Sequence, residues 1–464
     1  MASHEITAHN GHHRSLPRVW ELPPQQIVSD GLQRIRAAGS TYRLLLIITA
    51  ILGVVGVVAL IAGPVLSGWG ERQPWTYVAV TFGFLMSTVG AAPCVSVATR
   101  LVRGHWRRPV NRLAELWAAA MIVPLILFFL LVALLPNTEG RPSLWFGWWG
   151  APWLWDSLMM IALVICGYAF LYTAARPDMA IVRDQVDGNL NGRFARLARG
   201  FRGSTQEWRT VDRAVAYFGA LYVLLYVGTM TLISADFILA LIPGNNSAIF
   251  PATYTVQAFE SGVALTLVTA GVMRVWGGAR DYLHKEQFFA LGKLQLALGL
   301  LWFYFHWTEF IIWWYGRTPR ETALLRLLYF DTYFVPFAVA FALMFLAPLT
   351  VLLWNRIRAG VVGPIVVGAL VLVGQVFEQI RLYSASFSPN NIYEGELTVI
   401  PPAYVPGVLD ILILVGLIGG AVCLGLLALR FVPYPSIWEV TGGLWLRAKK
   451  PFHKTEVVVI GKPD

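Results

Sequence analysis

The stretch LLLIITAILGVVGVVALIA, residues 44–62, contains no charged side chain and is long enough to cross a bilayer as one helix. Nine further apolar stretches follow it along the chain. The ten predicted spans are 42–68, 75–101, 113–136, 151–175, 213–243, 249–274, 287–316, 328–354, 360–383 and 404–430. Because 57% of the residues are hydrophobic and only 13% are charged, we predict an all-α membrane protein with about ten transmembrane helices.

The 36 Lys and Arg residues are distributed very unevenly around these spans. If the N-terminus is cytoplasmic, the inner segments hold 29 of them and the outer loops hold 5. Positive residues favour cytoplasmic loops, so both termini are predicted to be cytoplasmic. We expect a tail at 1–41 with a short interfacial helix, a membrane domain at 42–431 with a soluble inner loop at 176–212, and a second tail at 432–464. This topology also accounts for the net charge of +10, so nucleic acid is not an expected partner.

Cysteine and histidine are too scattered in this sequence to predict a metal or haem site. Cys94, Cys166 and Cys423 lie in three different spans and form no CxxC pair. Of the eight histidines, only His306 lies inside a span, whereas a membrane b-haem needs two axial histidines. We therefore expect no bound metal, haem or iron–sulfur cluster in this chain.

Ionisable side chains within the spans gather toward the predicted outer face. Charged groups inside a bilayer are costly and usually face a cavity or a partner, so each is a candidate functional residue. The candidates are Asp236 in span five, Glu260 in span six, His306 and Glu309 on one face of span seven, and Glu378 and Arg381 in span nine. Their position predicts a polar, proton-exchanging pocket near the outer face.

Most of these candidates also have a purely structural interpretation. Glu378 and Arg381 could form an ion pair that only locks helices together, and His306 could be a core histidine with satisfied hydrogen bonds. Asp236 and Glu309 lie deeper in their predicted spans and have no cation nearby in the sequence. A functional role is therefore favoured for these two.

For the other acids, which lie near the ends of the spans, a structural role is the favoured interpretation. Asp156, Asp331 and Asp410 open their spans from the outside, where the helix dipole stabilises a carboxylate. Glu115, at the inner start of span three, could pair with Arg112 one turn earlier.

Quinol oxidation is a reaction that fits an outer layer of acids. It releases two protons and two electrons, so its site needs hydrogen-bond partners for the ring oxygens, a group that accepts protons and an apolar cleft for the isoprenoid tail. A carboxylate or a histidine near the water interface can supply the first two. The electrons would leave through the cofactors of a partner, because this chain offers no metal ligands of its own.

Six segments carry a family resemblance. They are GHWRRPVNRLAE (Gly104–Glu115), ARPDMAIVRD (Ala175–Asp184), SADFILALIPGNNSAIFP (Ser234–Pro251), HWTEFIIWWYG (His306–Gly316), GQVFEQI (Gly374–Ile380) and VPYPSIWEV (Val432–Val440). Together they resemble the NrfD/PsrC family, and most closely the membrane subunits of bacterial alternative complex III.

The resemblance implies two four-helix bundles with flanking helices and a quinone site near the periplasmic face, for menaquinone or ubiquinone. It implies periplasmic iron–sulfur and c-type haem subunits and a paralogous membrane subunit as partners, in the bacterial inner membrane. Asp236, Glu309 and Glu378 fall on acidic positions of the family. The full candidate set for the quinol pocket or a proton route is Asp236, Glu260, His306, Glu309, Glu378, Arg381 and Arg141.

Two departures from the family pattern leave other functions open. Catalytic members carry a histidine just before a Gly-Arg-Pro run, but the stretch NTEGRP at 137–142 contains none. The Glu-Arg pair of span nine is replaced by Glu378-Gln379. The alternative is a paralogous scaffold or proton-conducting subunit without a quinol site. A secondary transporter is less favoured, because the polar groups lie away from the midplane where such carriers bind their substrates.

Overall fold

The structure, a computed structural model, is that of a polytopic helical membrane protein. It describes residues 22–36, 39–68, 72–135, 145, 147–185, 189–389, 391–393, 395–445, 447–452 and 455–460. In this part of the chain, ten helical spans are long and apolar enough to cross a membrane. The predicted all-α membrane class and the number of spans are confirmed.

Several spans are built from more than one helical piece. The spans are α2 (Ser40–Ser67); η1 (Gln73–Trp75), α3 (Thr76–Leu85), η2 (Met86–Gly90) and α4 (Ala92–Leu101); η3 (His105–Arg107), α5 (Arg108–Glu115), η4 (Leu116–Met121) and α6 (Ile122–Val132); α7 (Trp153–Gln185); α9 (Thr205–Phe237) with η5 (Leu239–Leu241); α10 (Phe250–Val275); α11 (Lys285–Gly316); α13 (Phe334–Phe341), η7 (Ala342–Leu346) and α14 (Ala347–Leu352); α16 (Val362–Phe387); and α17 (Val408–Ala428). The segments η2 and η7 are π-helical.

Shorter elements connect or extend these spans. They are α1 (Pro24–Arg36), α8 (Asn189–Ala198), α12 (Pro319–Leu325), the π-helical η6 (Arg326–Phe330), α15 (Asn355–Arg358), α18 (Ile437–Trp445), and the strands β1 (Arg447–Phe452) and β2 (Thr455–Ile460). The two strands pair as an antiparallel hairpin beyond the last span. Helix α1 lies in the segment for which the sequence predicts a short helix.

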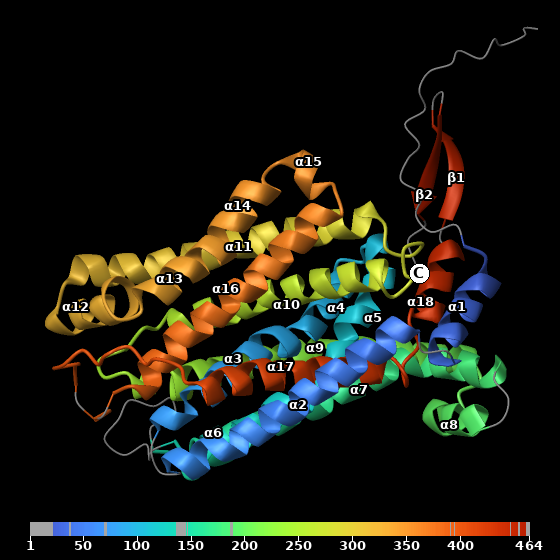
Figure 1. Ribbon diagram of the computed structural model, residues 1–464. Helices are drawn as coiled ribbons and strands as arrows, with labels where there is room; N and C mark the ends of the chain where they lie inside the picture. Colours follow the sequence, from blue (N-terminus) through green and yellow to red (C-terminus); the bar gives the residue numbers. More distant parts are fainter. Residues whose placement is uncertain are drawn as a thin grey trace, which may run out of the picture.

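Eight of the spans are arranged as two four-helix bundles (Figure 1). In the first bundle, α7 packs along α9, α3 packs on α6, and α4 contacts both α5 and α9. In the second, α10 packs along α11 and α16, and α16 also contacts α13 and α14. The bundles meet where α3 and α4 pack on α10 and α16, and the remaining spans, α2 and α17, lie together beside the first bundle.

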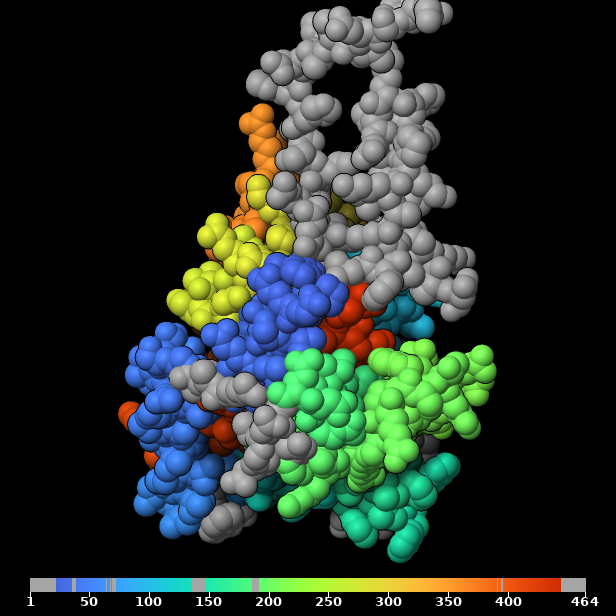
Figure 2. All heavy atoms as spheres, turned by 90° about the vertical axis from the view of Figure 1, so that its right-hand side faces the viewer, coloured from blue at the N-terminus to red at the C-terminus, as the bar shows by residue number. Residues whose placement is uncertain are grey.

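The two ends of the bundles differ in charge. We call the end that carries most Lys and Arg the basic end, and the opposite end the far end. Helices α1 and α18 pack against each other at the basic end, so both terminal segments of the described chain lie there (Figure 1). Figure 2 looks onto this end, with α1 in blue beside the red C-terminal segment and α8 in green below them.

The segment 176–212, predicted to be a soluble loop, is mostly helical. Helix α7 continues to Gln185, about 15 Å beyond the predicted end of its span at residue 175. Helix α8 follows, and α9 begins at Thr205 with a capping box in which Ser204 and Glu207 satisfy each other's backbone N–H groups. These turns contain many charged residues, so their mean hydropathy is low and the sequence places the span ends too early. In the structure the charged side chains are paired or exposed, and the helices continue past these positions.

Helices α2 and α17 approach each other through glycines. A Cβ atom built on Gly56 would lie 2.6 Å from the backbone carbon of Gly416, and one built on Gly416 would lie 2.4 Å from Cα of Gly56. In a membrane, helix association depends on such close backbone packing, because lipid tails are as apolar as the side chains. The two glycines therefore hold the flanking pair together.

We expect Gly56→Ala to lower the stability of the protein by about 1–3 kcal/mol, because the added methyl group forces α2 away from α17. The matched control is Gly63→Ala on the same helix, where the nearest atom to a new Cβ is Cδ1 of Ile413 at 3.9 Å. The midpoints of thermal unfolding in detergent measure the difference. Equal shifts in both variants would contradict this packing.

Candidate functional site

An ion pair between Glu378 and Arg381 is buried in the far half of the second bundle. Arg381 donates through Nε to Oε2 of Glu378 at 2.9 Å and through Nη2 to Oε1 at 2.6 Å. Both side chains are almost fully buried and both lie on α16. Because the pair lies within one helix, it does not itself join two helices. The guanidinium reaches neighbouring elements by lying over the rings of Tyr329 in η6 and Phe337 in α13, at 5.2 and 5.8 Å.

His306 and Glu309 of α11 face the same aromatic side chains. The His306 ring stacks on Phe337 at 5.7 Å and lies 5.4 Å from Tyr329. Both residues are buried, and Glu309 lies within electrostatic range of Arg381 and Glu378. The structure thus brings four predicted residues, His306, Glu309, Glu378 and Arg381, into one group, which we call the far cluster.

The far cluster contains buried polar atoms that lack a hydrogen-bond partner among the described residues. Nε2 of His306 and Oε1 of Glu309 are buried and have no hydrogen-bond partner among the described residues. The same holds for both amide atoms of Gln375, one turn before Glu378 on α16. A buried polar atom without a partner costs about 1–3 kcal/mol, so several of them close together point to a binding or proton-transfer role.

A line of polar side chains leads from the far cluster toward the middle of the second bundle. His306 stacks on Trp302 with their ring centroids 4.9 Å apart, and Nε1 of Trp302 donates to Oε1 of Gln257 at 3.3 Å. One turn further along α10, Glu260 accepts a hydrogen bond from Nε2 of Gln295 at 3.1 Å. Oε2 of Glu260 has no partner among the described residues. Glu260 therefore belongs to a deeper site than the far cluster.

Asp236 lies in the first bundle, in the last turn of α9. The helix ends at Phe237, where the backbone leaves α-helical geometry at Ile238. The span continues through η5 to Leu241, so Asp236 lies about 8 Å, at 1.5 Å per residue, from the end of its span, although the α-helix itself ends one residue after it. A fully buried carboxylate at the C-terminal end of a helix is disfavoured by the helix dipole, so this position still needs an explanation beyond packing.

A second polar group lies where the two bundles meet. The hydroxyl of Tyr254 lies 3.2 Å from Oε1 of Gln379 and 3.1 Å from the hydroxyl of Tyr383, and Nε2 of Gln379 lies 3.4 Å from Oγ of Ser87. Gly83 makes room for this group, because a Cβ there would lie within 2.4 Å of both Tyr383 and Gln379. Gln379 thus joins α16 to α10 and to the π-helical turn η2 of the first bundle.

Asp410 and Asp156 lie at helix N-termini as expected, whereas Asp331 lies three residues before α13 and forms a surface ion pair instead. Asp410 accepts the backbone N–H of Gly407 at 2.8 Å and the hydroxyl of Tyr404 at 2.9 Å in the first turn of α17. Asp156 lies in the first turn of α7. Asp331 pairs with Arg326 at 2.6 Å on the surface. The candidate Arg141 lies outside the described residues.

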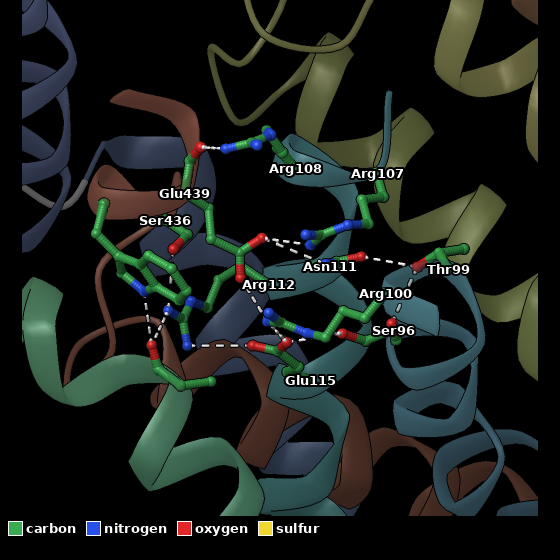
Figure 3. A network of polar contacts seen from close by, with 12 residues as sticks. Ser96, Thr99, Arg100, Arg107, Arg108, Asn111, Arg112, Glu115, Ser436 and Glu439 are labelled. Atoms are coloured by element: carbon green, nitrogen blue, oxygen red, sulfur yellow. Dashed lines mark hydrogen bonds and ion pairs between the residues drawn. The ribbon is translucent and has the colours of Figure 1, made fainter. Parts of the chain in front are cut away.

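Among the described residues, the largest group of buried ion pairs lies at the basic end (Figure 3). Arg112 of α5 pairs with Asp178 of α7 at 2.7 Å and, as predicted, with Glu115 at 3.2 Å. Arg100 of α4 pairs with both Glu115 and Glu439. We call this group, together with Arg107, the basic-end network.

The C-terminal segment closes the basic-end network. Glu439 of α18 accepts from Arg107 at 3.0 Å, and its backbone carbonyl accepts from Arg108. Asp178 accepts from Oγ of Ser436 at 3.0 Å and from the backbone N–H of Trp438 at 2.9 Å. Three buried carboxylates, Glu115, Asp178 and Glu439, thereby face three arginines. The segment at 432–440, predicted as the start of a tail, is packed into the membrane domain.

The expectation that buried charge concentrates at the outer side is therefore incomplete. Three of the six segments that carry the family resemblance, Gly104–Glu115, Ala175–Asp184 and Val432–Val440, meet in the basic-end network. The sequence contains a signal for it, since each segment has an acid close to an arginine or to a Trp-containing apolar run. Sequence spacing does not reveal that the three segments meet.

Among the described residues, no three His, Cys, Asp or Glu side chains are grouped so that they could hold a metal ion. No protein-family model matches the chain, and a search of curated proteins finds no relative. The fold and the geometry of the far cluster are thus the observations on which a function can be argued.

Proposed function

We propose that the chain is the quinol-interacting membrane subunit of an electron-transfer complex of the NrfD/PsrC type, similar to the membrane subunits of alternative complex III. It would lie in the bacterial inner membrane with both termini in the cytoplasm, so that the far end faces the periplasm. It would bind menaquinol or ubiquinol there and pass electrons to periplasmic iron–sulfur and c-type haem subunits, beside a paralogous membrane subunit. The far cluster is the observation that carries this proposal.

The residues of the far cluster suit the binding and deprotonation of a quinol. Bound quinol would supply two protons and two electrons. Glu309 has a carboxylate oxygen that can accept a proton, and His306 has a ring nitrogen that can hydrogen-bond a ring oxygen. The Glu378–Arg381 ion pair lies within electrostatic range of Glu309. Tyr329 and Phe337 provide flat apolar surfaces beside these groups.

The π-helical segment η6 also favours a functional site. It carries Tyr329, the ring that lies against both His306 and Arg381. Single π-helical turns are frequent at functional sites, because the extra residue widens the helix and redirects its side chains.

A second function, a proton-conducting subunit without quinol, is favoured by the polar line from His306 to Glu260. Its members join the far cluster to the middle of the second bundle, where Glu260 and Gln295 each have an oxygen without a hydrogen-bond partner in the described part of the chain. Such a line could carry protons whether or not a quinol is oxidised at its end. The transporter alternative has no comparable observation in its favour.

Purification of the chain with its native partners tests the class of complex. We expect copurifying subunits with the visible absorbance of c-type haem and the electron paramagnetic resonance signals of iron–sulfur clusters, and reduction of both on addition of a quinol. Purification of the chain alone, with solute uptake by the isolated protein in liposomes, would contradict the proposal and support a transporter.

A further inference from the structure

Two neighbouring cavities lie toward the basic end of the membrane domain. One, of about 260 Å³, lies between α1, α2, α10 and α17, and the other, of about 300 Å³, lies next to it between α3, α5, α10 and α17. They share Val272, Met273, Leu426 and Leu429 in their walls. We call the two adjacent cavities together the basic-end cleft, with the first cavity as its mouth and the second as its interior.

The mouth of the cleft is lined by two arginines whose partners are mainly backbone carbonyls. Arg34 donates to the carbonyls of Tyr434 and Gly278 at 3.0 and 2.9 Å. Arg430 donates to the carbonyl of Ile35 at 2.8 Å and lies over the ring of Tyr42 at 4.8 Å. A guanidinium has five N–H donors, so each arginine keeps donors for an additional acceptor.

The positive charge at this place is only partly balanced within the described part of the chain: Asp30, one turn before Arg34 on α1, accepts a hydrogen bond from the hydroxyl of Tyr282, whose ring lies under the Arg34 guanidinium. The ion pairs found there involve other arginines, and none joins a carboxylate to Arg34, Arg193 or Arg430. Arg193 of α8 donates to the backbone carbonyl of Arg430 and lies over Phe431 at 4.5 Å. Burial and electrostatic repulsion by the nearby Arg430 lower the pKa of Arg193. An anion at the mouth would relieve that repulsion.

The interior of the cleft has the polarity and depth of one membrane leaflet. It is lined almost entirely by apolar side chains, and its polar lining groups are satisfied among themselves: Trp117 donates to Thr269, and the hydroxyls of Thr88 and Thr269 donate to backbone carbonyls of the lining. Along α17 its lining runs from Leu429 to Ile418, which is about 16 Å at 1.5 Å per residue. Half of the hydrocarbon core of a bilayer is about 15 Å thick.

We infer that the basic-end cleft binds an anionic phospholipid, with the phosphate at Arg34 and Arg430 and one acyl chain in the apolar interior. The charge of the mouth selects a lipid with net negative charge, such as phosphatidylglycerol or cardiolipin, over a zwitterionic one. Basic pockets between membrane helices recognise such headgroups in the same way. The site is separate from the far cluster and does not depend on the proposed quinol chemistry.

Native mass spectrometry of the delipidated protein, in the assembly in which it purifies, tests this inference with two lipids that share acyl chains. We expect dioleoyl phosphatidylglycerol to bind at least about fivefold more tightly than dioleoyl phosphatidylcholine, since one arginine near a membrane surface contributes about that factor. Arg430→Gln should remove most of this preference. The matched control is Arg43→Gln, an exposed arginine of α2 that does not line the cleft.

A second variant tests the interior without touching an arginine, which matters because Arg430 also holds the end of α1. Val268→Phe fills the interior and should weaken the binding of both lipids about tenfold, whereas Val366→Phe on the exposed face of α16 should not. Equal affinity of the wild-type protein for the two lipids would overturn the inference. Unchanged phosphatidylglycerol binding in Val268→Phe would do so as well, because the acyl chain would then lie elsewhere.

Discussion

Replacing Glu309 by Gln is expected to reduce quinol-dependent electron transfer by at least about a hundredfold, the usual contribution of a positioned acid or base. Gln has nearly the same shape and keeps one hydrogen-bond acceptor, but it cannot take up a proton. The far cluster offers few substitutes, since the Glu378 carboxylate is already held by two hydrogen bonds from Arg381. Asp236→Asn is expected to have a similar effect if Asp236 carries protons onward from the first bundle.

The measurement is the rate at which a quinol reduces the haem of the purified complex, with subunit composition checked in parallel. Asp331→Asn is the matched control, because Asp331 is a carboxylate at the same end of the second bundle but is exposed and paired only with Arg326. It should keep the wild-type rate. Wild-type rates in both Glu309→Gln and Asp236→Asn would reject quinol oxidation by this chain and favour the paralogous scaffold.

The local geometry of the far cluster was accessible from the sequence. His306 and Glu309 lie three residues apart, as do Glu378 and Arg381, and any helix places such residues on one face. Hydropathy likewise locates all ten spans, because each crossing needs about 20 apolar residues. What the sequence does not predict is that Tyr329 and Phe337, from two other elements, bring the two pairs together. That convergence depends on packing between helices.

The errors at the ends of the spans have a common physical cause. The sequence begins span three at residue 113, whereas the structure begins it at His105, because a hydropathy pattern penalises the arginines at 107, 108 and 112. These arginines are tolerated because Asp178 and Glu439, far away in the sequence, supply the opposite charge and the hydrogen bonds. The outer end of span five is predicted closely, at 243 against Leu241, but the sequence does not show that α-helical geometry is interrupted at Ile238, directly after Asp236 and Phe237.

Asp178→Asn in the basic-end network is expected to destabilise the protein by about 3–5 kcal/mol, the cost of removing one partner from a buried ion pair. The Asp178 carboxylate is fully buried and accepts from Arg112, Ser436 and the backbone N–H of Trp438. The Asn side chain has the same shape but only one acceptor oxygen, so Arg112 keeps its charge in a site with too little negative charge. A lower thermal midpoint and faster proteolysis of the segment after Val432 are the expected results.

The control is Asp184→Asn, two turns further along α7, where the carboxylate is 63% exposed and pairs only with the adjacent Arg183. Exposed pairs contribute about 0–1 kcal/mol, so this variant should unfold at nearly the wild-type temperature. If the two variants were equally stable, the C-terminal segment would have to be held by its apolar contacts alone, through Ile437 and Val440. If instead only Asp178→Asn releases that segment, the buried charges fix its position, and the three resembling segments act as one structural unit.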